Sequence, residues 1–117
     1  MNIMNNELIQ LVTVLGTTSD NNGFKTGEET VNTEIFAGIK SVGRTEYYEA
    51  LRSGIEAKII FLVDMDDFRL SERMIEVDGE QKKISATRII YDGTTYLIGR
   101  TYRNNLGMLE ITCREVE

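Results

Sequence analysis

Length, composition and charge exclude several classes of protein. The chain has 117 residues with 13 basic and 19 acidic side chains, which gives a net charge of −6 at pH 7. The length fits one domain, 1–117, and the acidic excess argues against a protein that mainly holds phosphate backbone, because such binding needs clustered Lys and Arg. The sequence has no histidine, so the commonest general base and transition-metal ligand are absent, and we expect no enzyme, cofactor or metal site.

The apolar segments and the lone cysteine predict a cytoplasmic protein. No segment approaches the roughly 20 apolar residues that cross a bilayer, and residues 1–7 contain no basic leader. Cys113 is the only cysteine, so it forms no internal disulfide, as is usual in a reducing compartment. We therefore expect no contact with a membrane.

Two β-type segments joined by a polar turn begin the chain. Residues 7–15 are rich in branched side chains and predict a strand that ends at Gly16, and residues 28–42 alternate as a second strand does. The second strand is long, so we expect it to bend or to project beyond its partner, with a bulge at Gly38. Between the strands, residues 17–27 are dense in turn-forming residues and predict a flexible hairpin loop.

The sequence predicts one helix, at about residues 45–53. Thr45 suits the N-terminal cap, and Gly54 permits a left-handed exit from the helix. Helical spacing relates three apolar side chains that we expect to pack on the sheet, Tyr48, Leu51 and Ile55. Tyr47 lies off that row.

The second half of the chain predicts strands separated by tight turns. Residues 57–63 are continuously apolar and predict a central strand buried on both faces, which residues 64–68 close. Four more strands are expected, at residues 72–77, 82–91, 94–103 and 108–115. Asp78-Gly79 and Asp92-Gly93 are strong hairpin signals. The pattern predicts a mainly β fold, a small antiparallel β-barrel with one short inserted α-helix.

Two groups of residues could carry chemistry, and for each a structural role is favoured. Asp64, Asp66 and Asp67 lack the glycine and distal glutamate of a calcium loop, so we expect a solvated turn. Cys113 lies on an apolar row of the last strand with no histidine to lower its pKa. We expect it to fill the core.

A cluster of tyrosines and arginines near the C-terminus has two readings. It could form a stacking platform for single-stranded nucleic acid, built from Tyr91, Tyr96, Tyr102, Arg100 and Arg103. Alternatively, Tyr96, Ile98 and Tyr102 line the barrel while Arg100 pairs with an acidic neighbour. The second reading is favoured because alternation puts residues 96, 98, 100 and 102 on one sheet face. Similarly, Tyr47 and Tyr48 are either core aromatics or, for one of them, a subunit contact.

Two blocks of sequence carry a resemblance to a known family. The first is Ser41-Val42-Gly43-Arg44-Thr45-Glu46-Tyr47-Tyr48-Glu49-Ala50 with the strand from Lys58 to Val63. The second is Ile90-Tyr91-Asp92-Gly93-Thr94-Thr95-Tyr96-Leu97-Ile98-Gly99-Arg100-Thr101-Tyr102 with Leu109-Glu110-Ile111. Together they resemble the head-tail joining (head closure, or connector) family of tailed phages and prophages, and they cover most of the chain from residue 36 onward.

The resemblance implies a structural virion protein that is made in the host bacterial cytoplasm. Such proteins form a ring of about twelve copies below the portal and adaptor ring, close the DNA channel and present a docking surface to tail proteins. Double-stranded DNA passes transiently without specific binding. The implied contact surface is Arg44, Glu46, Tyr47, Tyr48, Arg52, Arg100 and Tyr102. The candidate channel loop is Asp20, Asn21, Asn22 and Gly23, with the charged segment 66–83 as a second possibility. The alternative function is a single-stranded nucleic-acid-binding or small regulatory β-barrel module of a mobile element.

Overall fold

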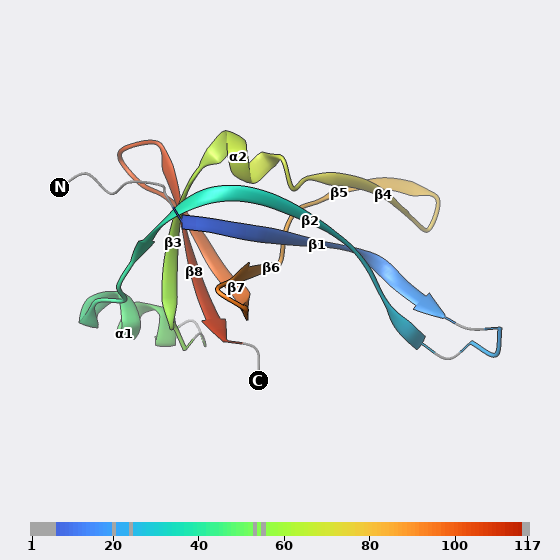
Figure 1. The fold of residues 1–117 in the computed structure, drawn as a ribbon, viewed down its shortest axis with the longest axis horizontal. Coiled ribbons are helices and arrows are strands. Elements are labelled where there is room, and N and C mark those ends of the chain that lie inside the picture. Colours follow the sequence, from blue (N-terminus) through green and yellow to red (C-terminus); the bar gives the residue numbers. More distant parts are fainter. Residues whose placement is uncertain (1–6, 20, 24, 53, 55, 116–117) are drawn as a thin grey trace.

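The chain folds into a mainly β structure with two short helices (Figure 1). The computed structural model describes residues 7–19, 21–23, 25–52, 54 and 56–115. The elements in chain order are β1 (Glu7–Ser19), β2 (Lys25–Lys40), α1 (Arg44–Arg52), β3 (Ile59–Asp64), α2 (Met65–Arg69), β4 (Arg73–Val77), β5 (Glu80–Ile84), β6 (Arg88–Tyr91), β7 (Thr94–Arg103) and β8 (Met108–Glu115). None of the helices in the described part of the chain has the length and apolar character needed to cross a membrane.

Six of the strands form one antiparallel sheet that closes into a ring. Their order is β1, β2, β3, β8, β7 and β6, and β6 pairs back on β1. β3 and β8 are central and pair over their full shared length, from Ile59 opposite Cys113 to Asp64 opposite Met108. The mainly β class and its antiparallel pairing, both predicted from the sequence, are therefore confirmed.

Apolar side chains from every strand of the ring fill its interior. The central members are Ile9, Leu11, Ile35, Phe61, Ile89 and Ile111, each at most 5% exposed. Val63 and Cys113 belong to the same cluster. On β3 the outward-facing residues Ile60 and Leu62 are buried as well, so the prediction of a strand buried on both faces is confirmed.

The first two strands extend far beyond the ring as a two-stranded arm. β1 pairs with β6 only at Gln10–Val12, and β2 pairs with β3 only at Gly38–Lys40. The described residues between 13 and 34, which we call the arm, therefore pair only within the β1–β2 ladder, and they project along the long axis of the molecule (Figure 1). The prediction that the second strand bends or projects is confirmed.

Two local predictions about the arm are wrong. Gly16 does not end the first strand, because β1 continues to Ser19 through a register shift between Val14 and Gly16. The bulge predicted at Gly38 is absent, because Gly38 pairs with Leu62 in regular register. The bulges of the β1–β2 ladder lie instead on β1, between Val14 and Gly16 and between Thr18 and Ser19. The predicted loop 17–27 is correspondingly shorter, and residues 20 and 24 lie outside the described chain.

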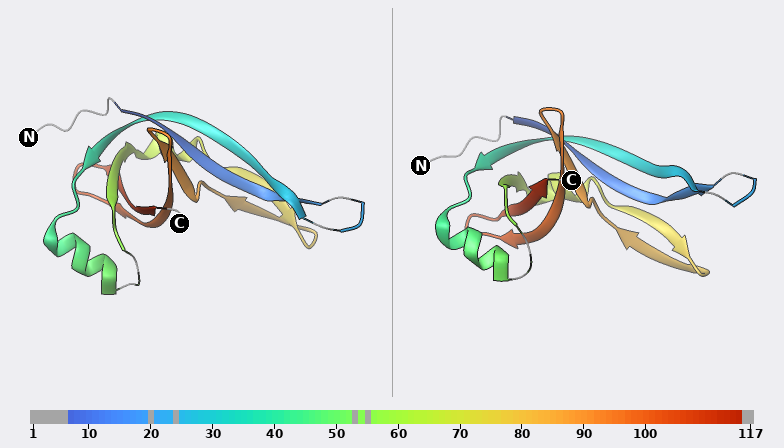
Figure 2. Two further views of the ribbon diagram at one scale, coloured as in Figure 1. Left: turned by 60° about the horizontal axis from the view of Figure 1, so that its bottom comes forward. Right: turned by 90° about the horizontal axis from the view of Figure 1, so that it is seen from below.

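A second helix and a second small sheet were not predicted. α2 occupies the segment expected to be a closing turn, and Asp64 caps it by accepting hydrogen bonds from the amides of Asp66 and Asp67 at 2.8 and 3.4 Å. β4 and β5 pair only with each other, and this hairpin projects on the same side of the ring as the arm (Figure 2).

The predicted strand 82–91 is divided into β5 and β6. The amides of Ala86 and Thr87, between these strands, do not continue the β4–β5 ladder. Ala86 N donates to Ser71 Oγ at 3.2 Å, and Thr87 N donates to Val12 O at 3.0 Å. Both Asp-Gly turns form as predicted, because Asp78 and Asp92 have φ of 52° and 49° and each following glycine is also positive.

Candidate functional site

The candidate site is built around α1, whose start and end are fixed by nearby groups. The helix begins at Arg44, one residue before the predicted start, and the Glu46 carboxylate accepts a hydrogen bond from Gly43 N at 2.8 Å. Glu46, and not Thr45, therefore satisfies an amide at this helix end. At the other end Gly54 has φ of 81° and its amide donates to Leu51 O at 2.9 Å, so the left-handed exit is confirmed. The helix ends at Arg52, and residue 53, the predicted last residue, lies outside the described chain.

Two ion pairs place α1 across the outer face of the sheet. Register puts Lys40, Ile60, Thr112 and Arg100 in one row across β2, β3, β8 and β7. Glu46 reaches Lys40 at one end of this row, and Glu49 reaches Arg100 at the other, at 3.9 Å. Ile60 and Thr112 in the middle of the row are buried, as is Ala50 on α1. Ala50 is the buried residue of the helix.

Lys40 is the electrostatic centre of this arrangement. Its Nζ lies 2.6 Å from Glu46 Oε1 and 3.5 Å from Glu110 Oε1. The hydrogen bond to Glu46 raises the pKa of Lys40. The hydrogen bonds that Glu46 accepts from Lys40 and Gly43 N lower the pKa of its carboxyl group. Both partners therefore stay charged across the physiological pH range.

A groove of about 360 Å³ lies between α1 and β7. Its lining residues are Lys40, Glu46, Glu49, Arg100, Tyr102 and Glu110. The structure thus brings together three of the predicted contact residues, Glu46, Arg100 and Tyr102. It adds Lys40, Glu49 and Glu110, which sequence reasoning missed. Lys40 and Glu110 are 70 residues apart in the chain, and no local sequence signal connects them.

A bulge in β7 separates the tyrosines and arginines that were expected to share a face. Ile98 pairs with Cys113 and Arg100 with Thr112, so the register shifts by one residue at Gly99. Tyr96 and Ile98 therefore pack on the core, whereas Arg100 and Tyr102 line the outer groove. The prediction of a single face is wrong, but the predicted pairing of Arg100 with an acidic neighbour is confirmed by Glu49.

The outer side of α1 carries a second group of exposed residues. Tyr48 is 54% exposed and Leu51 is 46% exposed, so the prediction that they pack on the sheet is wrong, and Ile55 lies outside the described chain. Arg44 and Arg52 share this side at helical spacing and are exposed. We call Arg44, Tyr48, Leu51 and Arg52 the α1 stripe. Tyr47 is half-buried and contacts Tyr48 edge to face, with ring centroids 5.8 Å apart.

Two of the three tyrosines of the supposed stacking platform contact the core instead. Tyr91 and Tyr96 each meet Phe61 edge to face, with centroids 5.7 and 5.8 Å apart. Because Phe61 is fully buried, these rings present little free face for a nucleobase. Burial, together with a contact to Glu7, raises the pKa of Tyr91.

The residues weighed for metal binding and nucleophilic chemistry have structural roles. In the described part of the chain, no group of three or more His, Cys, Asp or Glu side chains is placed to hold a metal ion. Asp64 is the cap of α2. Cys113 is fully buried, and desolvation raises its pKa to about 12. The prediction that Cys113 fills the core is confirmed.

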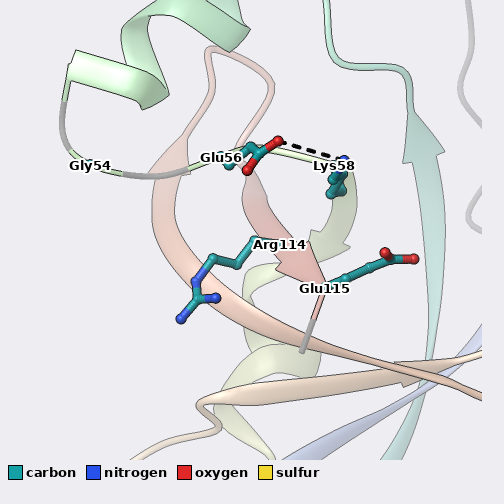
Figure 3. Close-up of a pocket in the computed structure, with 5 residues that line it drawn as sticks. All are labelled: Gly54, Glu56, Lys58, Arg114 and Glu115. Carbon is teal, nitrogen blue, oxygen red and sulfur yellow. Dashed lines mark ion pairs between the residues drawn. The ribbon is translucent and has the colours of Figure 1, made fainter. Parts of the chain in front are cut away.

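A second, larger depression lies beside the exit of α1 (Figure 3). It has a volume of about 460 Å³ and is lined by Gly54, Glu56, Lys58, Arg114 and Glu115. Glu56 and Lys58 pair at 3.7 Å, and Arg114 points away from that pair. The lining mixes both signs of charge, and none of its residues belongs to the contact surface expected from the sequence.

The candidate channel loop lies at the tip of the arm, remote from the groove. Asn21, Asn22 and Gly23 are exposed, and Gly23 has φ of 83°. Asp20 lies outside the described residues. The arm and α1 occupy opposite ends of the long axis, along which the molecule extends 54 Å (Figures 1 and 2). The two predicted contact regions are therefore separate surfaces.

Comparison of the chain with known proteins identifies no family. The sequence matches no protein-family model, and a search of curated proteins finds no similar sequence.

Proposed function

We propose that this chain is a head-tail joining protein of a tailed phage or prophage. In this role about twelve copies form a ring below the portal and adaptor, close the DNA channel and present the surface to which the tail docks. The closed ring of six strands serves as a small β-barrel that holds the contact surfaces in place. The protein acts in the host cytoplasm during assembly and then in the virion.

The observation that carries the proposal is that the two blocks of sequence that resemble the head-tail joining family lie next to each other in the structure. The first block contains most of α1 and of β3, and the second contains the end of β6, most of β7 and part of β8. In the sheet β3, β8 and β7 are neighbours, and the Lys40–Glu46 and Arg100–Glu49 pairs tie α1 to β2 and β7 on either side of β3 and β8. Segments far apart in the sequence thus form one continuous unit. The arm, α2 and the β4–β5 hairpin lie outside it, where members of a structural family can specialise.

Electron microscopy of the protein mixed with the portal and adaptor of its own phage or prophage tests the proposal. We expect an additional ring of density below the adaptor. A portal and adaptor assembly that forms normally but gains no density from an excess of this protein would contradict the proposed role.

Binding of single-stranded nucleic acid is the weaker proposal. It would need exposed aromatic faces, and Tyr91 and Tyr96 pack against Phe61. Oligonucleotide binding with a steep salt dependence would favour it over the joining role.

A further inference from the structure

The arm has an open strand edge that nothing in the described chain covers. On the side away from β1, β2 pairs with β3 only from Gly38 to Lys40, so the rest of β2 has no partner strand there. Exposed strand edges invite pairing with other chains, and proteins commonly protect them with charges or with a covering helix. Glu29 and Glu34 are both exposed and are an odd number of residues apart, so they flank this edge from the two faces of the strand.

The charge of the arm is predominantly negative. Between residues 13 and 34 its acidic residues are Asp20, Glu28, Glu29 and Glu34, and its single basic residue is Lys25. Glu28 is engaged by Arg88 on β6, with an Arg88 Nη1 to Glu28 Oε1 distance of 2.9 Å, and this contact lowers the pKa of Glu28. Within the described chain, Glu29 and Glu34 form no ion pair.

The α1 stripe has the opposite character. Both carboxylates of the helix are used toward the sheet, because Glu46 contacts Lys40 and Glu49 contacts Arg100. The outer side is left with Arg44 and Arg52, neither of which pairs with an acid among the described residues. Between them Tyr48 and Leu51 are exposed. Tyrosine and arginine side chains are enriched at protein interfaces, where they surround an apolar centre.

The dimensions of the two surfaces match. Glu34 is five positions after Glu29 in an extended strand, so their Cα atoms are about 17 Å apart. Arg52 is eight positions after Arg44 in a helix, so their Cα atoms are about 12 Å apart. Long glutamate and arginine side chains span the difference. Within the described chain no ion pair joins Glu29 or Glu34 to Arg44 or Arg52, so these charges are available to another copy.

We propose that the open edge of β2 in one copy of this chain docks on the α1 stripe of the next copy. Glu29 and Glu34 meet Arg44 and Arg52, and the helix covers the strand edge beside Tyr48 and Leu51. Because the two surfaces differ, the contact is head to tail, and repetition generates a closed ring when the rotation closes. The inference rests on the proposed function in that it names the subunit contact of the proposed ring. The tip of the arm extends past this contact.

Cross-linking between single-cysteine additions tests the contact. One chain carries Glu34→Cys, a second carries Arg52→Cys, and the two are mixed in equal amounts with a short bis-maleimide at low salt. Cys113 can stay in place because it is buried and its pKa is raised to about 12. The matched control replaces Arg52→Cys by Leu106→Cys, a site 86% exposed on the loop between β7 and β8.

We expect the Glu34→Cys and Arg52→Cys mixture to give about tenfold more cross-linked dimer than the control, because Glu29 and Arg44 still carry opposite charges that steer the contact. The excess should disappear in about 1 M NaCl, where the Debye length is about 3 Å. Adding Arg44→Gln to the Arg52→Cys chain should lower the yield further. Equal yields from the test and control mixtures would overturn the inference.

The proposed function and this contact can fail separately. Cross-linking is measured on the isolated chain and repeated in the mixture with portal and adaptor. Ring density without excess cross-linking in either sample would overturn the arm contact and leave the joining role standing. Specific cross-linking without any ring density would support the contact and contradict the joining role.

Discussion

The hydroxyl of Thr13 donates a buried hydrogen bond to the carbonyl oxygen of Ser71 at 2.7 Å, across 58 residues of sequence. The Ser71 hydroxyl in turn donates to Phe68 O at 2.8 Å and accepts from Ala86 N at 3.2 Å. Thr13 and Ser71 are both fully buried. This polar cluster joins the base of the arm to the end of α2 and to the connection between β5 and β6, and so fixes the direction of both hairpins.

The first prediction is that this cluster contributes strongly to stability. Ser71→Ala leaves the buried amide of Ala86 without a partner, so we expect a loss of about 1–3 kcal/mol in the free energy of unfolding. Thr13→Val should cost a similar amount because the Ser71 carbonyl becomes unpaired. Thr13→Ser keeps the hydroxyl and is the control. Urea unfolding measures all three, and Ser71→Ala as stable as the parent would contradict the assignment.

The second prediction concerns the Asp92-Gly93 turn. Gly93 has φ of 78°, a conformation that costs a residue with a Cβ atom about 1 kcal/mol or more. We therefore expect Gly93→Ala to lower the unfolding free energy by about that amount. Gly16→Ala is the control, since a Cβ there meets nothing within 4 Å and its φ is not positive. Thermal unfolding should separate the two variants; equal midpoints would argue against strain at the turn.

Sequence predicts this fold best where local chemistry decides the conformation. The bounds of β7 and β8 and both Asp-Gly turns follow from residues that tolerate positive φ. α2 has a readable signal, the cap Asp64 followed by two acidic residues, but at five residues it is too short to show helical periodicity. The division of the strand at 82–91 depends on Ser71, a distant partner that no local pattern reveals.

The candidate site was predictable only in part, for two physical reasons. The bulge at Gly99 moves Arg100 and Tyr102 to the face opposite Tyr96, and one unpaired residue leaves no trace in the apolar pattern. Helical spacing correctly placed Tyr48 and Leu51 on one side of α1. Spacing does not tell whether that side meets the chain's own sheet, and here Ala50 takes that place.

The third prediction concerns Cys113 at high pH. Its pKa is raised to about 12 in the folded chain, while an unfolded thiol titrates near 8.5. Because the pKa of Cys113 is higher in the folded state than in the unfolded state, its contribution to folding stability is fully present below about pH 8.5. That contribution is lost as the pH rises from about 8.5 toward 12. At pH 10 the loss should be about 2 kcal/mol.

Comparison with Cys113→Ala isolates this effect. The variant loses some packing energy at pH 7, but its stability should fall less between pH 8 and pH 10, because it has no thiol to ionise. The other groups that titrate there, such as Tyr91, are the same in both proteins and so cancel in the comparison. Urea unfolding at the two pH values measures the difference. Parallel losses in both proteins would show that the thiol is not protected from ionisation.

The fourth prediction concerns Glu46 at low pH. Its pKa is lowered by the hydrogen bonds from Lys40 and Gly43 N, so its contribution is present above the unfolded value and is lost as the pH falls through the folded value. We expect Glu46→Gln to cost about 0.5–1 kcal/mol at neutral pH, since the pair is partly exposed. Near pH 3 the difference should shrink. Glu56→Gln, at the more exposed pair with Lys58, is the control and should change little.

The fifth prediction concerns retention of DNA and follows from the proposed ring. Each chain carries a net charge of −6, so a ring repels phosphate unless basic residues gather in the bore. Arg100 lies beside Glu49 in the α1 groove, whereas Arg103 lines a different pocket with Asp64 and Asp66. The two arginines do not form one phosphate-binding surface, so closure should be steric.

Two variants distinguish steric closure from binding of DNA by arginine. Arg100→Gln combined with Arg103→Gln should package and retain DNA normally in assembled particles. Replacing residues 20–24 by Asn-Gly should let DNA leak, because the shortened hairpin no longer reaches the bore. A parallel shortening within 66–83 tests the other candidate loop. Nuclease protection measures retention, and electron microscopy verifies that each ring is intact. Leakage from the arginine variant with an intact ring would show that basic side chains hold the DNA.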